Sequence, residues 1–384
     1  MRPHHWITVA VSLAGLAVPN PAPAQVERIW LTHRTSDPSM AVVAWTTKTP
    51  GDSAMRFGPT KAYGREVRGA GNTTLHHVEI PLPQSGGVHY SVGTGGQASD
   101  DAVFPGYPAD VLRVAVVANW RGKPDLRSLR TDGVHLLLTA GDNVPDLHGK
   151  CGVGTKDCTK PYEALIDSYP ELFRSTPFLP ALGNHDREIR PRGPEPPAEP
   201  VYDVDATAFR TFFPLPGDGW KWHFDVPAFG VRFVALDLGH IQDRGTTWQT
   251  CHDFGRDSAQ FRWYERLTAD RPPGFVVTLH NERNATMRGQ ERGAWHGLFR
   301  RGELVVSGFG YYAERAEVDG RTYLNTSLGT GAKYADPGAQ FIQAKAGYAL
   351  LTFERGKPSL AVELKALDGT VLDRADIPVR TVRR

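Results

Sequence analysis

Short apolar runs separated by turn residues fill the first part of the chain. Between Val26 and Phe104 the runs are rich in β-branched and aromatic residues and show no helical period. They cover residues 29–32, 41–46, 54–57, 77–82 and 88–92. Strands at this spacing predict a small all-β sandwich. His76 and His77 are adjacent here, and adjacent strand residues face opposite sides, so we expect one to point inward and one outward.

From Val111 onward, apolar strands alternate with segments that suit helices. The strand-like runs cover residues 112–117, 134–138, 178–182, 231–237, 275–279, 304–306, 349–353 and 359–364. One helix-like segment, 161–169, opens with Pro161, which suits the first helical turn. Another, 258–267, has Ser258 in the N-cap position and apolar residues on one face. This alternation predicts a layered α/β domain.

Four of these strands end in polar or glycine-marked turns. Asp142 follows one strand, and Asn184 and His185 follow the next. His280 ends a later strand, and Gly-Phe-Gly-Tyr follows the fourth at residues 308–311. In α/β sheets ligands bind beyond the carboxyl ends of the strands, so such side chains converge in space. An amide oxygen can ligate a metal and an imidazole can move a proton. We therefore expect Asp142, Asn184 and His280 to meet.

Composition and charge narrow the class of protein. The 384 residues are enough for two domains, with 40% hydrophobic and 22% charged residues, as in ordinary globular proteins. The formal net charge is +2 and the basic residues are scattered except at 187–192, so no nucleic-acid-binding face is predicted. Residues 190–200 include five prolines and predict an exposed loop near His185.

Residues 1–25 have the pattern of a secretory signal peptide. Arg2 and two histidines form a polar start, residues 6–18 an apolar core, and Ala-Pro-Ala at 22–24 a small-residue cleavage site. The core is too short to span a bilayer as a helix, although an uncleaved anchor is the rival interpretation. No later stretch is apolar enough for a transmembrane segment. We expect an exported protein, periplasmic or extracellular.

Three cysteines follow this segment. In an oxidising compartment, Cys151 and Cys158 could close a small loop, because the glycines between them let the chain turn back. Cys251 is left over, and is either buried or competes for one of the other two. The chain has no Cys-x-x-Cys pair, which argues against a thiolate metal site.

The ordered turn motifs resemble those of the calcineurin-like metallophosphoesterases. The motifs are Gly141-Asp142, Gly183-Asn184-His185-Asp186, a strand ending in His280, and Gly308 followed by Glu314-Arg315. Within that family the chain is most similar to the purple acid phosphatases, which carry a small N-terminal fibronectin-like domain. The resemblance implies a fibronectin-like all-β sandwich at residues 26–104. A layered α/β metallophosphoesterase domain, a β-sandwich flanked by helices, would follow at residues 110–380.

In that family five turns supply the ligands of two metal ions. Carried over by position, the resemblance makes Asp142 the carboxylate that bridges both metals. The chain departs from the family at the first turn, where Asn119 stands in place of Asp, and at Pro145, where a Tyr is expected. It also departs at the fifth turn, where Phe309 and Tyr311 replace two histidines.

These departures change the metal content that we expect. Two ions held close together need several anionic ligands to offset their repulsion, and Asp142 is the only certain one. Asn119 is neutral, and Tyr311 could bind a ferric ion only as a phenolate. The first metal position is therefore expected to be lost, and the second to keep Asp142, Asn184 and His280. We expect one divalent or trivalent ion, Fe, Zn or Mn, with a pair as the alternative.

The resulting hypothesis is a secreted, metal-dependent phosphoesterase of the acid phosphatase type. A metal-bound hydroxide would attack the phosphorus of a phosphorylated small molecule, and His185, as imidazolium, would protonate the leaving alkoxide. Arg187 is a candidate for phosphate binding, with a solvated arginine as the alternative. For His280 the alternative is a core histidine at a strand end. His252 and His296 have no motif support and are expected at the surface.

Two further interpretations stay open. In the first, the chain keeps the fold but binds a phosphorylated ligand, a glycan or a protein partner without turnover. The lost histidines favour this interpretation, and the intact turn motifs favour the enzyme. In the second, sequence-distant residues such as Asp146, His148 or Asp186 replace the missing ligands. The oligomeric state cannot be predicted from the sequence.

Overall fold

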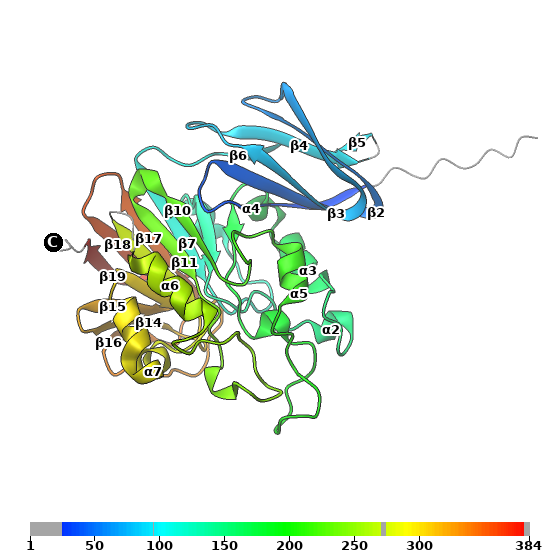
Figure 1. The fold of residues 1–384 in the computed structure, drawn as a ribbon. Coiled ribbons are helices and arrows are strands. Elements are labelled where there is room, and N and C mark those ends of the chain that lie inside the picture. Colours follow the sequence, from blue (N-terminus) through cyan, green and yellow to red (C-terminus); the bar gives the residue numbers. More distant parts are fainter. Residues whose placement is uncertain (1–24, 95, 270–273, 380–384) are drawn as a thin grey trace, which may run out of the picture.

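The computed structural model describes residues 25–94, 96–269 and 274–379. Its strands form three sheets, and the helices lie beside the sheets and in the loops that join the strands (Figure 1). Apart from Gln25, the predicted signal peptide lies outside the described residues. Within the described ranges, no helix combines the length and the apolar character that a membrane crossing requires.

The first sheet has six strands, all paired antiparallel. They are β1 (Val26–Thr32), β2 (Met40–Gly58), β3 (Arg65–Pro81), β4 (Val88–Thr94), β5 (Gln97–Ala98) and β6 (Ala102–Phe104). The long strand β2 pairs with β1, β3 and β4, and the buried side chains include Trp45, Met55 and Tyr90. The predicted all-β character of this region is confirmed. Its fibronectin-like relationship and the boundaries of both domains stay predictions.

The first sheet packs against helices of the layered domain that follows it. Trp30 of β1 stacks on Phe212 at 4.2 Å between ring centroids, and Arg28 pairs with Asp167 at 2.9 Å. The two adjacent histidines of β3 face opposite sides, as predicted. His76 is buried against Trp45, whereas His77 lies near Trp30.

The other two sheets are mixed and contain the predicted strands of the layered domain. One has the order β10-β11-β12-β13-β15-β14-β16 and the other the order β19-β18-β17-β7-β8-β9. The first consists of Trp222–Val226, Val231–Ala235, Phe275–His280, Leu304–Ser307, Arg321–Asn325, Ala313–Val318 and Ala339–Gln343. The second consists of Val371–Pro378, Ser359–Ala366, Gly347–Glu354, Val111–Val117, Leu136–Thr139 and Phe178–Leu179. Strands β11, β12, β13 and β15 run parallel, as do β7, β8 and β9.

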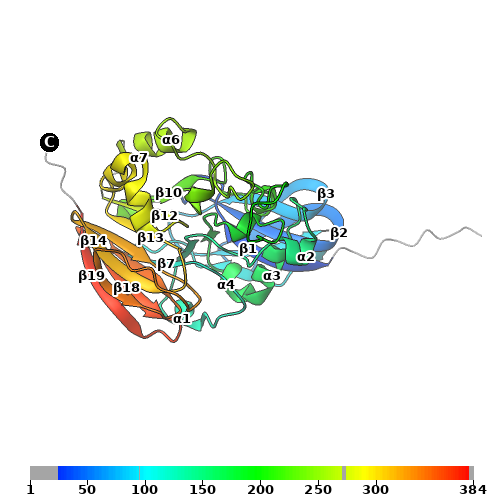
Figure 2. The same ribbon diagram turned by 90° about the horizontal axis from the view of Figure 1, so that it is seen from below.

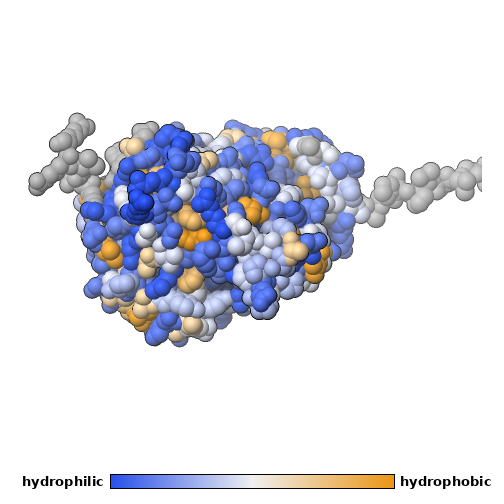
Figure 3. All heavy atoms as spheres, turned by 60° about the horizontal axis from the view of Figure 1, so that its bottom comes forward, coloured by the Kyte–Doolittle hydropathy of each residue, from blue (hydrophilic) through white to orange (hydrophobic). Residues whose placement is uncertain are grey.

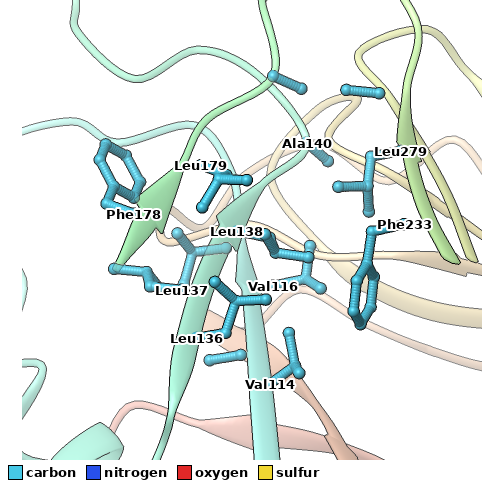
Figure 4. Packing of buried hydrophobic residues seen from close by; sticks show 14 of the residues in the cluster. Val114, Val116, Leu136, Leu137, Leu138, Ala140, Phe178, Leu179, Phe233 and Leu279 are labelled. Atoms are coloured by element: carbon cyan, nitrogen blue, oxygen red, sulfur yellow. The ribbon is translucent and has the colours of Figure 1, made fainter. Parts of the chain in front are cut away.

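The main hydrophobic core lies between these two sheets. Phe233 and Leu279 come from one sheet, and Val114, Val116 and Leu138 come from the other (Figure 4). All five side chains are fully buried. The contact fixes the two sheets face to face, so the carboxyl ends of their parallel strands lie at one edge of the layered domain.

Helices cover the outer face of the seven-stranded sheet. Strand residues Val234, Val276 and Val305 form a second buried cluster with the apolar side chains of α6 (Ala259–Ala269) and α7 (Asn284–Phe299). Ser258 caps α6 as predicted, because its hydroxyl accepts a hydrogen bond from the Phe261 backbone N–H. The backbone of α7 leaves the helical conformation at residues 290–293.

Shorter helices lie mostly at the other sheet and in the loops. They are α1 (Arg127–Thr131), α2 (His148–Cys151), α3 (Lys160–Ser168), α4 (Pro170–Phe173) and α5 (Thr207–Phe212), with 3-10 turns η1 (His185–Arg187), η2 (Pro227–Phe229) and η3 (Ile241–Asp243). Figure 2 shows α1, α3 and α4 on the side away from α6 and α7. The arrangement agrees with the predicted β-sandwich flanked by helices.

The cysteines and the surface complete the fold. Cys151 and Cys158 form a disulfide, as anticipated, and Cys251 is a buried free thiol. The face shown in Figure 3 is mainly hydrophilic, with small apolar groups between the polar ones. Among the described residues, the exposed large hydrophobic side chains are Val103, Val153 and Tyr334.

Candidate functional site

The loops after β8 and β9 bring two of the predicted motifs together. Asp142 follows β8 in the left-handed backbone conformation, with φ of 57°. Gly183, after β9, packs directly on it, since a Cβ at this glycine would lie 2.1 Å from Asp142 Oδ1. Asp142 Oδ1 accepts a hydrogen bond from the His185 backbone N–H at 3.2 Å. Asn184 directly precedes His185 in this loop and is 5% exposed.

His185 is surrounded by charged groups. Its Nδ1 lies 2.9 Å from Oε2 of Glu188, and its Nε2 lies 2.9 Å from Nη2 of Arg121. Burial lowers the pKa of this imidazole, but the carboxylates of Asp142 and Glu188 outweigh burial and raise the pKa to about 9. His185 is therefore an imidazolium at neutral pH. Neither Glu188 nor Arg121 was anticipated, since neither belongs to a motif.

A second histidine extends this charged group. His148 Nε2 lies 3.7 Å from Oε1 of Glu188, and its Nδ1 lies 3.6 Å from Oδ1 of Asp146. Glu188 thus stands between His185 and His148. Two of the residues considered as replacement ligands, Asp146 and His148, therefore lie beside the candidate site.

Asp186, the third such residue, holds the two loops together. It is fully buried and accepts hydrogen bonds from the backbone N–H groups of Gly183 and Asn143 and from the side-chain amide of Asn143. Burial and the neighbouring Asp142 raise its pKa to about 7, against the effect of these hydrogen bonds. These contacts give Asp186 a structural role in positioning Asp142 and His185.

His280 faces away from Asp142. It lies on the same side of β12 as Thr278, whose hydroxyl is 2.7 Å from the hydroxyl of Tyr264 in α6. The His280 ring stacks on Phe299 of α7 at 5.7 Å, and its Nδ1 accepts a hydrogen bond from the Glu282 backbone N–H. Burial lowers its pKa to about 3, so it is neutral. The expected meeting of His280 with Asp142 is not found, and the core-histidine alternative describes its place.

The next residue, Asn281, occupies the position that His280 was expected to fill. Its side-chain amide donates hydrogen bonds to the carbonyl oxygens of Ala140 and Gly308, both at 3.2 Å. It packs so closely on Gly141 that a Cβ there would lie 2.8 Å from the Asn281 Cβ. A polar residue directly after a strand end is the sequence signal that could have identified it.

Asn119 closes the same edge from the loop after β7. Its side-chain amide donates hydrogen bonds to the carbonyl oxygens of Gly308 and Gly310, at 2.7 and 2.8 Å. Asn325 holds that loop from its other side, since its Oδ1 accepts from the Phe309 backbone N–H and its amide donates to the Tyr312 carbonyl. The loop after β13 is thus fixed by neutral amide groups.

Aromatic side chains line the neighbouring surface. The guanidinium of Arg121 lies 4.9 Å from the ring centroid of Tyr311, and Phe309 contacts Tyr334 at 5.4 Å between ring centroids. Tyr334 is 46% exposed. Burial and then Asp142, against the effect of Arg121, raise the pKa of Tyr311, so it is a neutral phenol. The positions at which the resembled family has histidines therefore carry aromatic rings.

Arg187 is placed differently from its predicted role. Its side chain is fully buried, pairs with Asp237 at 2.6 Å and donates to the Val204 carbonyl. Arg187 is therefore unavailable to a phosphate in this structure. The sequence did not predict this, because the partners that bury Arg187 lie far from it in the chain.

Two histidines expected at the surface form ion pairs. His252 also pairs with Asp237, at 2.6 Å, and stacks on Trp220. The other such residue, His296, lies between the Tyr323 hydroxyl and Asp319.

These placements test whether the chain fits a metal ion. In the described part of the chain, no three His, Cys, Asp or Glu side chains form a group that could hold one. Asn119 and Asn281 point amide N–H groups at carbonyl oxygens, Tyr311 is neutral, and His280 lies on the helix side. Asp142 and Asn184 alone do not make a metal site. The donor set does not fit the predicted Fe, Zn or Mn ion.

Comparisons with known proteins return only distant similarities. No family model and no curated protein matches the chain. Among solved structures, GAP50, the anchor in the inner membrane complex of Plasmodium, has 14% identity and a TM-score of 0.47, with 71% of this chain and 90% of that chain covered. A predicted phosphoesterase of Streptococcus pneumoniae has 9% identity and a TM-score of 0.32, covering 70% and 98%.

A third similar structure is Vps29 of Entamoeba histolytica, complexed with zinc. It has 12% identity and a TM-score of 0.30, covering 69% of this chain and 99% of that chain. All three TM-scores are too low to carry an argument about the present chain. The relationship to the calcineurin-like metallophosphoesterases stays a prediction from the turn motifs, and the site is interpreted from its own residues.

Proposed function

We propose that this chain binds a phosphorylated ligand without metal-dependent turnover, at His185 and Arg121. The observation that carries the proposal is the 2.9 Å contact between Arg121 Nη2 and His185 Nε2, which places two groups that can both carry positive charge side by side. Arg121 donates to Nε2 while the ring is neutral, and once His185 is protonated, as its raised pKa favours, both groups are donors that face the same space. A phosphate oxygen placed between them would accept from both and relieve their repulsion.

The aromatic side chains beside Arg121 favour a ligand that carries a ring. Tyr311 lies against the guanidinium, and Tyr334 is partly exposed beyond Phe309. Aromatic faces pack well on the apolar face of a ring in a ligand. A phosphorylated sugar or a comparable phosphorylated ring compound combines both features. The carboxylates of Asp142 and Glu188 limit the total negative charge that the site accepts, which favours a ligand with one phosphate group over a diphosphate.

The second candidate is the phosphoester hydrolase of the acid phosphatase type that the turn motifs predict. One observation favours it: His185 is protonated at neutral pH and lies next to Asp142 and Asn184, as a general acid for a leaving alkoxide would. The donor set gives no support to a bound Fe, Zn or Mn ion, and we derive no metal-dependent step.

Export of the protein is also part of the proposal. The Cys151–Cys158 disulfide supports it, because such bonds persist mainly in oxidising compartments. Fractionation of expressing cells, with the disulfide checked by thiol labelling, tests this part. Reduced Cys151 in a cytosolic fraction would contradict it.

Calorimetric titration with glucose 6-phosphate, and with glucose as the unphosphorylated control, tests the binding site. We expect binding of the phosphate ester alone, and a loss of roughly 10- to 100-fold in affinity in His185→Gln and in Arg121→Gln, as for hydrogen bonds to charged groups. Arg68→Gln, on the first sheet and largely exposed, is the matched control and should bind normally. Equal affinity in all four proteins would contradict the proposal.

Hydrolysis of 4-nitrophenyl phosphate, with Fe, Zn or Mn supplied, separates the two candidates. The binding proposal expects the wild-type rate to equal that of Asp142→Asn, and elemental analysis to find less than one bound metal per chain. A wild-type rate well above that of Asp142→Asn, with one or two metals per chain, would establish the hydrolase instead.

A further inference from the structure

A separate pocket lies between the end of the first sheet and helices α1 and α4. Its volume is about 780 Å³. Its walls come from the segment after β6, from the loop at residues 123–126 and from the two helices, which lie near each other in Figure 2. None of the residues discussed at the candidate site lines this pocket. Pockets of roughly 300–1,000 Å³ are those that enclose most of a small organic ligand.

The inside of the pocket is mainly apolar. Phe104, Leu126 and Leu129 are buried at its floor, and Leu172 and Val134 are partly buried in its wall. Three prolines at residues 105, 124 and 170 also line it, and their fixed backbone angles favour a preformed shape. Water against such a surface is unfavourable, so a ligand with an apolar body gains free energy on entering.

Unpaired positive charge exceeds unpaired negative charge at the rim of the pocket. Arg127 is neutralised by Asp125 at 2.6 Å, and Glu171 by Arg174 at 2.8 Å. Lys123 and Arg130 also line the pocket, and within the described residues no carboxylate forms an ion pair with either. The rim therefore has two unpaired cations and no unpaired carboxylate among its lining residues.

A partly buried polar group that lines the pocket fits the same ligand. His135 Nδ1 accepts a hydrogen bond from the Arg113 backbone N–H at 3.1 Å, which leaves the proton of the neutral ring on Nε2. His135 lines the pocket, so it can offer a hydrogen-bond donor there. An apolar body with an acceptor group at one end matches the floor, the rim and this donor together.

We propose that this pocket binds a small organic anion, with one carboxylate or sulfonate group on an aromatic or short alkyl body. The apolar body packs on Phe104 and Leu129, and the anionic group lies near Lys123 and Arg130. The inference is independent of the proposal for His185 and Arg121. The two sites are nevertheless joined, since the loop that carries Arg121 continues into the lining residues Lys123 and Leu126.

Displacement of a fluorescent probe tests the proposal. The probe is 8-anilinonaphthalene-1-sulfonate, an aromatic sulfonate, and the competitors are decanoate, decanol and decyltrimethylammonium. We expect decanoate to displace the probe at the lowest concentration and the cation at the highest. Equal displacement by all three would show a merely hydrophobic surface and overturn the proposal.

Two kinds of variant locate the binding. Leu172→Trp fills the pocket and should abolish decanoate-sensitive probe binding, whereas Val153→Trp, at a position 60% exposed and away from the pocket, should not. Reversing both cations, Lys123→Glu with Arg130→Glu, should weaken decanoate binding roughly tenfold, in the range for two exposed ion pairs. The control Lys61→Glu with Arg355→Glu changes two exposed cations elsewhere.

Outcomes at the two sites can be told apart. Leu172→Trp should bind glucose 6-phosphate like the wild type, and His185→Gln should bind decanoate like the wild type. Unchanged decanoate affinity in both the filled and the charge-reversed variants would overturn the inference, whatever the result at His185. Sedimentation that shows concentration-dependent self-association, reversed by the pocket variants, would assign the surface to a second copy and also overturn it.

Discussion

The two sheets contribute unlike loops to the same edge of the layered domain. The loops after β8 and β9 carry Asp142, His185 and Glu188, which form a charged group. The loops after β12 and β13 carry Asn281 and Phe309, and these are neutral. A metal ion at this edge would need ligands from both halves. The difference teaches that a chain can keep one half of such a constellation while the other half becomes a purely structural contact.

The neutral half is a built structure and not only a loss of ligands. The Gly308 carbonyl accepts hydrogen bonds from the side chains of Asn119 and Asn281, which come from opposite sheets. Each amide satisfies a buried carbonyl that would otherwise be unpaired. The side-chain N–H groups of Asn119 and Asn281 are thus used to join the loops of the two sheets. Only their Oδ1 atoms are left for another contact, and a neutral oxygen does not replace the charge of a carboxylate or the donor strength of an imidazole.

Replacing Arg187 should produce the largest effect, because this residue joins the charged half to the loop after β11. We expect Arg187→Met to lower the free energy of unfolding by about 3–5 kcal/mol, since it removes the buried guanidinium and leaves the buried Asp237 with His252 alone as its ion-pair partner among the described residues. Urea denaturation measures the change, and glucose 6-phosphate affinity should stay the same under native conditions. Arg190→Met, whose partner Glu199 is exposed, should cost less than about 1 kcal/mol. If Arg187→Met lost affinity for glucose 6-phosphate while its free energy of unfolding stayed unchanged, Arg187 would be a ligand-binding residue after all.

His280→Ala tests the place of the histidine on the helix side. The ring is fully buried on Phe299 and accepts from the Glu282 backbone, so we expect a loss of about 3 kcal/mol from the cavity and the unpaired N–H. The partly exposed His296 is the control, and His296→Ala should cost about 1 kcal/mol. Thermal unfolding measures both. If His280→Ala removed a stoichiometric metal while stability stayed constant, the assignment to the core would be wrong.

Asn119→Asp tests whether the neutral half of the edge is a structural contact or a half-site that a carboxylate can restore. The substitution replaces an N–H donor by a carboxylate oxygen that faces the carbonyls of Gly308 and Gly310. We expect a loss of about 2–3 kcal/mol in chemical denaturation, with no recovery on adding Zn or Mn, because one further carboxylate does not complete a site. Asn72→Asp, at an exposed position, is the control. Recovery of stability with one bound metal per chain would show that the half-site is still competent.

The sequence indicates the charged half much better than the neutral one. Asp142 and His185 follow strands in a turn-rich context, and local motifs were enough to place them together. For His280 the signal was missing, because residues 275–280 are buried on both faces and show no polar alternation that marks which face meets the helices. The register of β12 decides which face His280 occupies, and that register depends on the pairing of His280 with Ser307 of β13.

Long-range pairing also limits what the sequence reveals about Arg187 and Glu188. Arg187 is buried by Asp237, 50 residues later, and Glu188 gains its role from His185 and from His148 in a different loop. The layered α/β class, the Ser258 cap and the disulfide depended on local spacing, which is visible in one chain. Contacts between distant loops leave no comparable mark.

The smallest expected effect concerns the titration of His185. Burial alone would lower its pKa, but Asp142 and Glu188 raise it to about 9, above the unfolded value of about 6.5. A raised histidine pKa stabilises the fold fully below about pH 6.5, and this contribution is lost as the pH rises through about 9. Since the side chain is 21% exposed, solvent reduces the contribution to about 1 kcal/mol.

Two measurements follow from this argument. The pH dependence of unfolding should flatten between about pH 6.5 and 9 in His185→Gln, and the imidazole NMR signal of His185 in the wild type should titrate near pH 9. His280 should stay neutral down to about pH 3. A His185 midpoint near the unperturbed value would mean that the carboxylates do not reach it. The imidazolium would then be absent at neutral pH, and with it the cationic pair on which the phosphate proposal depends.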